Sequence, residues 1–423
     1  MAHPLLDLAP AHRAGRKPGI TSVCSAHPVV IEAALRHGLA ADRPVLIEAT
    51  CNQVNQDGGY TVMTPAGFRD FVERIAARVG YPAGRIILGG DHLGPNPWKH
   101  LSAPEAMAKA EAMIAAFAAA GFTKLHLDTS MGCASEPVAL ADAVTAERAA
   151  RLAAVAESHR HGPHAPVYII GTEVPVPGGA VEGLDHLQIT RAEAVATTYA
   201  IHKAAFAEVG QSDAFARVIG LVVQPGVEFG HDEVIHYAPA KARALSAALT
   251  GLPGIVFEAH STDYQTGDGL RQLVADGFSI LKVGPWLTFA LREALYGLDA
   301  IADVLDGHAP RNRLMQAMEA VMQAAPANWA KYYQGGAADL WLQRHFSYSD
   351  RIRYYWPEPT AVQAVTALFD LLGDRDLPET LIGQYLGGLY PDVRAGRLPP
   401  RARDLALAAV DRVTQDYIAA CVD

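Results

Sequence analysis

The chain has 423 residues, of which 50% are hydrophobic and 19% are charged, so it carries enough apolar material for a large folded core. A formal net charge of −10, with no dense lysine or arginine cluster, argues against nucleic acid as a partner. No apolar run approaches the roughly 18 residues that cross a bilayer, so a membrane partner is not expected either.

The N-terminal residues and the cysteines predict a cytoplasmic protein. The first residues lack the basic-then-apolar order of a signal peptide. The four cysteines have neither CxxC nor zinc-finger spacing, which predicts a reducing compartment and no disulfide framework.

Short apolar, β-rich runs bounded by turn residues recur along the chain, and we predict each to be a strand. Most of them are continuously apolar, as expected of parallel strands that are buried on both faces. The predicted strands span residues 19–28, 44–50, 85–92, 124–130, 167–174, 217–225, 254–261 and 279–285.

Segments with helical periodicity lie between these runs. Two of them open with the pattern of a capping box, formed by Ser102 with Glu105 and by Thr190 with Glu193. Eight repeats of strand and helix predict a (β/α)₈ barrel, that is, a TIM barrel. A doubly wound sheet is the alternative, but no G-x-G-x-x-G motif follows the first strand.

The pattern changes near residue 306, after which no further strand is predicted. We therefore expect a barrel over residues 1–305 and a helical C-terminal extension, packed on the barrel, over residues 306–423. The stretch "FSYSDRIRYYWPEP" (346–359) is predicted to be an amphipathic helix that packs on the barrel or on a dimer partner. Arg351 and Arg353 in this stretch are candidates to reach an anionic substrate, with Arg351 preferred.

Polar residues gather at the ends of the predicted strands, where the active site of a TIM barrel lies. Helix caps require only Ser, Thr, Asp or Asn, so capping does not account for the histidines, glutamates and lysine found there. We predict substrate contacts from Asn52, Gln53, Asp128, Ser130, Glu228, Ser261, Asp263 and Lys282.

Two histidines at these strand ends, His92 and His260, are the best candidates to hold a divalent metal ion. Imidazole combined with carboxylate or amide oxygen suits zinc or another first-row ion such as manganese. An open coordination position would polarise a substrate carbonyl. The candidates for a third ligand are Gln224, Glu228, His231 and Glu173.

Asp91, which stands next to His92, is the predicted general acid/base, with Glu173 or Glu258 as its counterpart. As an alternative, Asp91 caps the following helix. His126 is interpreted as structural, although its alternation with leucines would also let it point into the barrel.

Several longer blocks, among them "RIILGGDHLGPNPW", "GTEVPVPGG", "VVQPGVEFGH" and "FEAHSTDYQT", closely resemble the Z-type subunit family of D-tagatose-1,6-bisphosphate aldolase. The resemblance covers essentially the whole chain. In two-component members the Z-type chain is a non-catalytic subunit that activates and stabilises a Y-type aldolase partner. Other members resemble metal-dependent 4-epimerases that interconvert fructose-type and tagatose-type sugars or their phosphates.

The same blocks are also similar to class II fructose-bisphosphate aldolases. That resemblance implies that Asp91 is the acid/base, that His92 and His260 are zinc ligands, and that Glu173 is the glutamate of the fifth strand. Gln224 stands where those aldolases have a histidine, and His231 follows several residues later, so the third ligand stays open. The "HSTDY" loop has fewer glycines than the phosphate loop of the aldolases. This favours unphosphorylated or singly phosphorylated ketoses.

Two hypotheses follow from these observations. The first is an enzyme that breaks and re-forms the C3–C4 bond of a ketohexose or its phosphate, by C4 epimerisation or by aldol cleavage. The second is a non-catalytic partner of a Y-type aldolase. Buried ionisable groups cost stability unless they are used or paired, which favours the enzyme. A sugar-phosphate kinase would need a nucleotide-binding motif, which the sequence lacks. A homo-oligomer is expected in either case.

Overall fold

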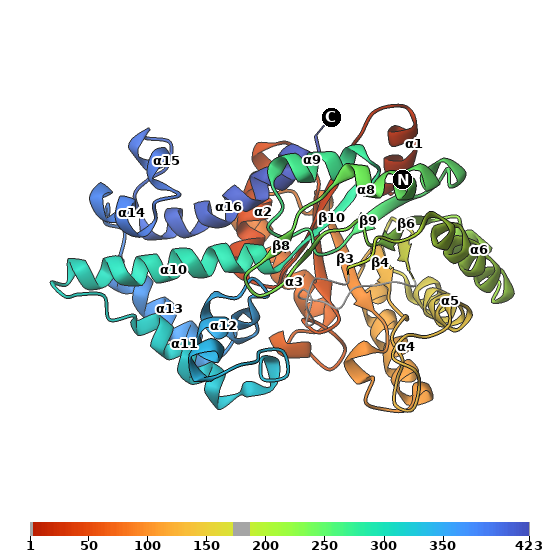
Figure 1. Ribbon diagram of the computed structural model, residues 1–423, viewed down its shortest axis with the longest axis horizontal. Helices are drawn as coiled ribbons and strands as arrows, with labels where there is room; N and C mark the ends of the chain where they lie inside the picture. Colours follow the sequence, from red (N-terminus) through yellow and green to blue (C-terminus); the bar gives the residue numbers. More distant parts are fainter. Residues whose placement is uncertain (1–2, 172–186, 423) are drawn as a thin grey trace.

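The computed structural model describes residues 3–171 and 187–422, and at its centre eight parallel strands form a closed barrel (Figure 1). Around the barrel the strands follow the order β1-β10-β9-β6-β5-β4-β3-β2, so the predicted TIM barrel is confirmed. Each barrel strand overlaps one predicted run. The barrel strands are β1 (Ile20–Cys24), β2 (Val45–Thr50), β3 (Ile86–Leu93), β4 (Lys124–Leu127), β5 (Val167–Ile170), β6 (Val218–Val223), β9 (Val256–Ala259) and β10 (Ile280–Val283).

A helix follows each barrel strand and covers the outside of the barrel. The covering helices are α2 (Pro28–Ala40), α3 (Pro65–Val79), α4 (Ala103–Ala119), α5 (Asp142–His159), α6 (Ala192–Glu208), α8 (Pro239–Ala248), α9 (Gly267–Ala275) and α10 (Pro285–Leu305). The smaller elements of this part are α1 (Leu8–Arg13), α7 (Ser212–Phe215), the 3-10 helices η1 (Pro4–Asp7), η2 (Gly59–Thr61), η3 (Ala83–Arg85), η4 (Asn96–Trp98) and η6 (Leu249–Gly251), and the antiparallel pair β7 (Glu228–Phe229) and β8 (Val234–Ile235).

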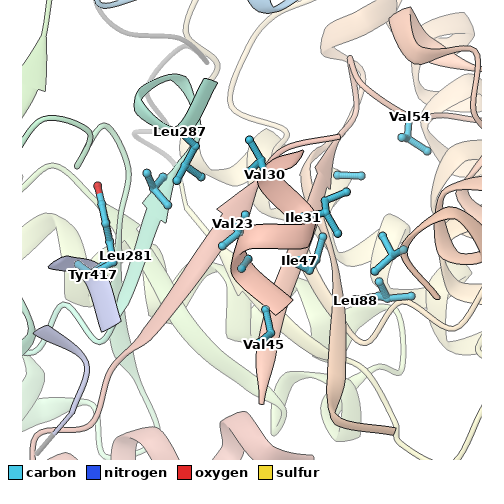
Figure 2. Close-up of a cluster of buried hydrophobic side chains, with 14 of the residues drawn as sticks. Val23, Val30, Ile31, Val45, Ile47, Val54, Leu88, Leu281, Leu287 and Tyr417 are labelled. Atoms are coloured by element: carbon cyan, nitrogen blue, oxygen red, sulfur yellow. The ribbon is translucent and has the colours of Figure 1, made fainter. Parts of the chain in front are cut away.

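The strands are buried on both faces, which explains their nearly continuous apolar sequences. On the outer face, Val23 and Ile47 pack with Val30 and Ile31 of α2 (Figure 2). A separate apolar cluster fills the inside of the barrel at the N-terminal ends of the strands, where Leu5 of the N-terminal segment joins it. The opposite end of the barrel interior is polar.

One of the two predicted capping boxes is present. Ser102 and Glu105 form it at the start of α4. The box predicted at Thr190 is wrong, because α6 begins only at Ala192. The Thr190 hydroxyl instead accepts the backbone N–H of Gln224 at 2.9 Å, which ties this segment to the end of β6.

The C-terminal extension is helical, as predicted, and gathers along the outer half of α10 (Figure 1). The last helix, α16, returns to the barrel and packs against α2, α9 and α10. Among the described residues no helix is both long and apolar enough to cross a bilayer. The elements of the extension are α11 (Arg313–Ala324), η7 (Pro326–Asn328), α12 (Ala337–Phe346), η8 (Arg351–Tyr355), α13 (Pro359–Leu372), α14 (Glu379–Tyr385), α15 (Tyr390–Arg394) and α16 (Ala402–Ala420).

The structure of this region differs from one prediction and leaves another open. The stretch 346–359 is not one amphipathic helix. Helix α12 ends at Phe346, and Asp350, with a left-handed φ of 45°, interrupts the helical backbone before η8. The division of the chain at residue 305 stays a prediction. That residue is the end of α10, which packs against barrel helix α2 and against the extension alike.

Candidate active site

At the end of β3, the side chains of Asp91 and His92 point to the same side of the strand. Neighbouring residues of a regular strand point in opposite directions. Here the register between β3 and β4 shifts between Gly90 and Leu93, and His92 has a left-handed φ of 49°. This irregularity lets both side chains face the barrel mouth, with His92 Nε2 3.6 Å from Asp91 Oδ2.

Three imidazoles meet at this point. His92 of β3, His126 of β4 and His260, which follows β9, have ring centroids 5.0 to 5.1 Å apart. His126 Nδ1 lies 2.9 Å from Asp91 Oδ1, and His126 Nε2 is buried without a hydrogen-bond partner among the described residues. The backbone N of His92 also lies 3.2 Å from His126 Nδ1. In the tautomer whose Nδ1–H donates to the Asp91 carboxylate, Nε2 carries a lone pair that is available to a metal ion.

The surrounding groups also fit a divalent metal. Asp91, His126, Glu258 and His260 each offer a ligand atom, and these atoms lie within 4.8 Å of one another. His92 lies beside this group, and its Nδ1 is 2.8 Å from Asp128 Oδ2. Imidazole nitrogens together with carboxylate oxygens form the donor set of zinc and related first-row ions.

Beneath the imidazoles, buried charges of alternating sign form a ring. Lys124 Nζ lies 2.6 Å from Glu48 Oε1 and 2.5 Å from Glu258 Oε2. Lys282 pairs with Glu48 and Asp91 and lies 3.5 Å from Glu258 Oε1, which closes the ring. Glu258 Oε1 is also 2.9 Å from His260 Nε2 and so orients that ring.

The charges of this cluster do not balance without a further cation. The carboxylates of Glu48, Asp91 and Glu258 pair with the ammonium groups of Lys124 and Lys282, and Asp128 pairs with His92. Four carboxylates and two ammonium groups leave two negative charges when all the imidazoles are neutral, and one when His92 is protonated. All of these side chains are buried, where unpaired charge is costly. A divalent cation would neutralise the excess.

The protonation states of the cluster follow from burial and from the neighbouring charges. Burial would raise the pKa of Asp91, but His92 and Lys282 outweigh it and hold that pKa well below its usual value. Burial lowers the pKa of His260 to about 3 despite the hydrogen bond to Glu258, so this ring is neutral, as a metal ligand has to be. Burial would likewise lower the pKa of Lys282, yet Asp91 and the neighbouring anions raise it well above normal.

A polar pocket opens above the cluster, and η8 of the extension forms part of its wall. Asp91, His92, His260 and Lys282 form its floor. The remaining polar or aromatic side chains of its lining are Thr50, Asn52, Gln53, Tyr60, Phe229, Ser261, Asp263, Arg353 and Tyr354.

The predicted substrate contacts fall into two groups. Asn52, Gln53, Ser261, Asp263 and Lys282 line the pocket. The others do not line it and bind neighbouring groups. Asp128 contacts His92 and accepts the Ser130 hydroxyl at 3.1 Å, while Glu228 accepts the backbone N–H of Phe229 at 3.0 Å. Burial raises the pKa of Glu228 to about 7.

The structure does not bring Gln224 or His231 to the imidazole cluster. The Gln224 side-chain oxygen accepts the backbone N–H groups of Gly226 and Val227 at 2.8 and 3.0 Å and so stabilises a turn. His231 lies in the loop that carries β7 and β8, which directs it to the extension. Its Nδ1 is 3.0 Å from Ser347 Oγ.

Three more predicted site residues are not seen in the lining of the pocket. Glu258 lies beneath the site, where it orients His260, and does not line the pocket. Arg351 donates to the Asn328 carbonyl and stacks 3.3 Å from the ring centre of Tyr332, so it turns away from the pocket. Glu173 lies outside the described residues.

The sequence interpretation missed residues inside the barrel. His126 was interpreted as structural, and Glu48 and Lys124 received no role. The signal was present, because "KLHL" in β4 alternates polar and apolar residues, and Glu48 is a single charge within an apolar strand. In a barrel, alternate residues of a strand point inward, so such residues mark a polar interior.

Similarity to known proteins shows the family of this chain. Residues 5–422 match the family model described as D-tagatose-1,6-bisphosphate aldolase subunit GatZ/KbaZ-like. The chain belongs to this family. A D-tagatose 6-phosphate 4-epimerase from Agrobacterium fabrum (strain C58 / ATCC 33970) is 55% identical to this chain over 418 residues, which cover 98% of both chains.

A solved structure supports the GatZ/KbaZ-like assignment as well. The crystal structure of a probable tagatose 6 phosphate kinase from Sinorhizobium meliloti 1021 is 63% identical, with a TM-score of 0.89. The match covers 95% of this chain and 100% of that one. The resemblance seen in the sequence is thus confirmed, and this GatZ/KbaZ-like chain is an enzyme.

Proposed function

We propose that this chain is a divalent-metal-dependent 4-epimerase of a ketohexose phosphate of the D-tagatose 6-phosphate type. The relative that is 55% identical over the whole chain carries that activity in its name. The observation that carries the proposal is the buried cluster. Three converging imidazoles, one with an unpartnered nitrogen among the described residues, lie beside Asp91 and Lys282 at the floor of a polar pocket.

The residues that would hold the metal are His126 and His260, with His92 at the third corner and the carboxylates of Asp91 and Glu258 within reach. Zinc or manganese fits this donor set. Bound there, a divalent cation would polarise the ketose carbonyl and stabilise negative charge on neighbouring oxygens.

In this proposal Asp91 moves the proton. His126 and Lys282 both contact its Oδ1, and Oδ2, which lies 3.6 Å from His92 Nε2, would accept a substrate hydroxyl. As a carboxylate it takes the proton of the C4 hydroxyl. The C3–C4 bond then breaks and its electron pair passes to the three-carbon fragment, while C4 becomes an aldehyde. After the aldehyde turns over, C3 attacks its other face and Asp91 returns the proton, so no further reactant is needed.

A second function is favoured by the family description, which names an aldolase subunit. In that case the chain would stabilise a Y-type aldolase partner and would not itself need a metal. Co-expression with such a partner distinguishes the two functions. A His260→Ala variant that still activates the partner fully would support the subunit function.

The experiment for the proposed function follows D-tagatose 6-phosphate and D-fructose 6-phosphate by NMR. We expect interconversion by purified protein, its loss after chelation, and its recovery with zinc or manganese. Asp91→Asn should lower kcat by roughly 10²–10⁴-fold, since a general acid/base is removed. No turnover by metal-loaded wild type, or equal turnover by Asp91→Asn, would contradict the proposal.

The metal ligands can be tested without activity. We expect His126→Gln to lose bound metal in elemental analysis, because it removes the imidazole whose nitrogen is unpartnered. His231→Gln is the matched control, since this histidine binds Ser347 instead. Metal loss in the control but not in His126→Gln would favour the ligand set expected from the sequence.

A further inference from the structure

Two basic side chains of lysine or arginine line the polar pocket, Lys282 at its floor and Arg353 on its wall. Lys282 pairs with Glu48 and Asp91. Among residues 3–171 and 187–422, the hydrogen bonds of Arg353 go to carbonyl and hydroxyl oxygens, and no carboxylate lies within ion-pair distance of it. Arg353 therefore has no direct carboxylate partner there, and its charge acts on Asp263 and Asp350 only over a longer distance.

Its own contacts fix the guanidinium of Arg353 in place. Nη1 donates to the backbone carbonyls of Ser349 and Asp350, the latter at 3.0 Å. Nη2 donates to the Tyr354 hydroxyl at 3.1 Å, and the guanidinium carbon lies 4.6 Å from the centre of that ring. The Nε–H and one Nη2–H have no acceptor within the described part of the chain. A fixed guanidinium with free donors is suited to bind an anion.

The usual phosphate position of a TIM barrel is already occupied here. In many such barrels, phosphate binds between the loops after the seventh and eighth strands, at a helix N-terminus. In this chain Asp263, after β9, accepts the backbone N–H groups of Gly284 and Trp286 at 3.0 and 2.8 Å, where α10 begins. A side-chain carboxylate thus takes the donors that a substrate phosphate would otherwise use.

We infer that Arg353 recognises the phosphate group of the substrate, so that the C-terminal extension and not the barrel loops selects a phosphorylated ketose. This inference rests on the proposed function. Guanidinium and phosphate pair through two parallel hydrogen bonds, and the two free donors of Arg353 allow such a pair. Arg351 cannot share this role because it stacks on Tyr332 outside the pocket.

The test compares D-tagatose 6-phosphate with unphosphorylated D-tagatose. For Arg353→Met we expect KM for the phosphorylated sugar to rise by roughly 10- to 100-fold, the size of lost charge-assisted hydrogen bonds. KM for D-tagatose should stay unchanged, which a structural defect would not achieve. Arg353→Lys should recover part of the loss. Arg403→Met is the matched control, since Arg403 stacks on Phe369 and does not line this pocket.

Titration calorimetry of D-tagatose 6-phosphate, with each variant in an Asp91→Asn background, gives a readout without turnover. Weaker binding on loss of Arg353 supports the inference. Equal losses for both sugars in kinetics, or unchanged binding of the phosphorylated sugar, overturn it. If the wild type binds the phosphorylated sugar through Arg353 but never epimerises it, the proposed function fails alone. If it epimerises and Arg353→Met keeps the wild-type KM, the inference fails alone.

Discussion

Gly89 of β3 is the register partner of Glu48 in β2, and the two residues share one space in the barrel interior. A Cβ at position 89 would lie 2.6 Å from Glu48 Cγ and 2.9 Å from its Cδ. Since Glu48 pairs with Lys124 and Lys282, the missing side chain of Gly89 makes room for the ring of charges beneath the site.

Gly89→Ala should therefore destabilise the protein and disturb its site. We expect the free energy of unfolding to fall by about 1–3 kcal/mol, the usual cost of overpacking, as measured by urea denaturation. Gly84→Ala is the matched control because nothing lies within 4 Å of the added carbon there. If both variants lose the same stability, the crowding explanation does not hold.

At the same scale, the polarity of the strand ends identified Asp91, His92, His260 and Lys282 as neighbours. This works because a barrel brings the ends of its parallel strands together. His126 was not assigned to the site, because whether a single strand histidine points inward depends on the register of its strand with both neighbours.

Among the elements, two helices begin with a histidine that acts as a cap. His3 Nδ1 accepts the N–H of Leu5 in η1, and His27 Nδ1 accepts the N–H of Val29 in α2, each at 3.2 Å. An accepting imidazole must be neutral. Burial lowers the pKa of both histidines from 6.5 to about 4.

This lowered pKa predicts acid sensitivity. The unfolded chain takes up protons below pH 6.5, whereas the folded histidines resist until about pH 4. The stabilisation is thus complete above pH 6.5 and is lost as the pH falls toward 4. His27→Asn keeps a cap acceptor but does not titrate. Between pH 7.5 and 5 we expect it to lose roughly 1–2 kcal/mol less unfolding free energy than the wild type. Parallel pH profiles for the two proteins would refute this.

The bulge in β3 is a feature of the element that periodicity did not predict. The sequence shows Asp91 and His92 side by side, and a regular strand would separate them. The left-handed backbone at His92 is uncommon for a residue with a side chain and is held by the neighbouring strands.

For the whole molecule, the extension completes both the core and the pocket. One apolar cluster runs from the barrel through α10 into Leu314, Leu368 and Val410 of the extension. The Tyr417 hydroxyl of α16 donates to the Thr262 carbonyl at 2.7 Å, next to the pocket, and η8 supplies Arg353 to its wall.

Residues 1–305 alone should therefore not form a stable barrel. Without the extension the buried outer half of α10 and the faces of α2 and α9 that contact α16 would be exposed to water. We expect little soluble protein and no cooperative unfolding transition in circular dichroism, with recovery on co-expression of residues 306–423. A soluble fragment that unfolds cooperatively would instead establish the barrel as an independent domain.

Sequence alone determined the eight strands, the helices between them and the polar strand ends, because hydrophobic periodicity and turn residues act locally. It also determined the family. Only the tertiary structure decided that His126 joins the imidazoles while His231 and Gln224 do not, and that Arg353 faces the pocket while Arg351 turns away. The reason is physical: a register shift, a left-handed residue or a stacking contact redirects a side chain without changing the pattern of the chain.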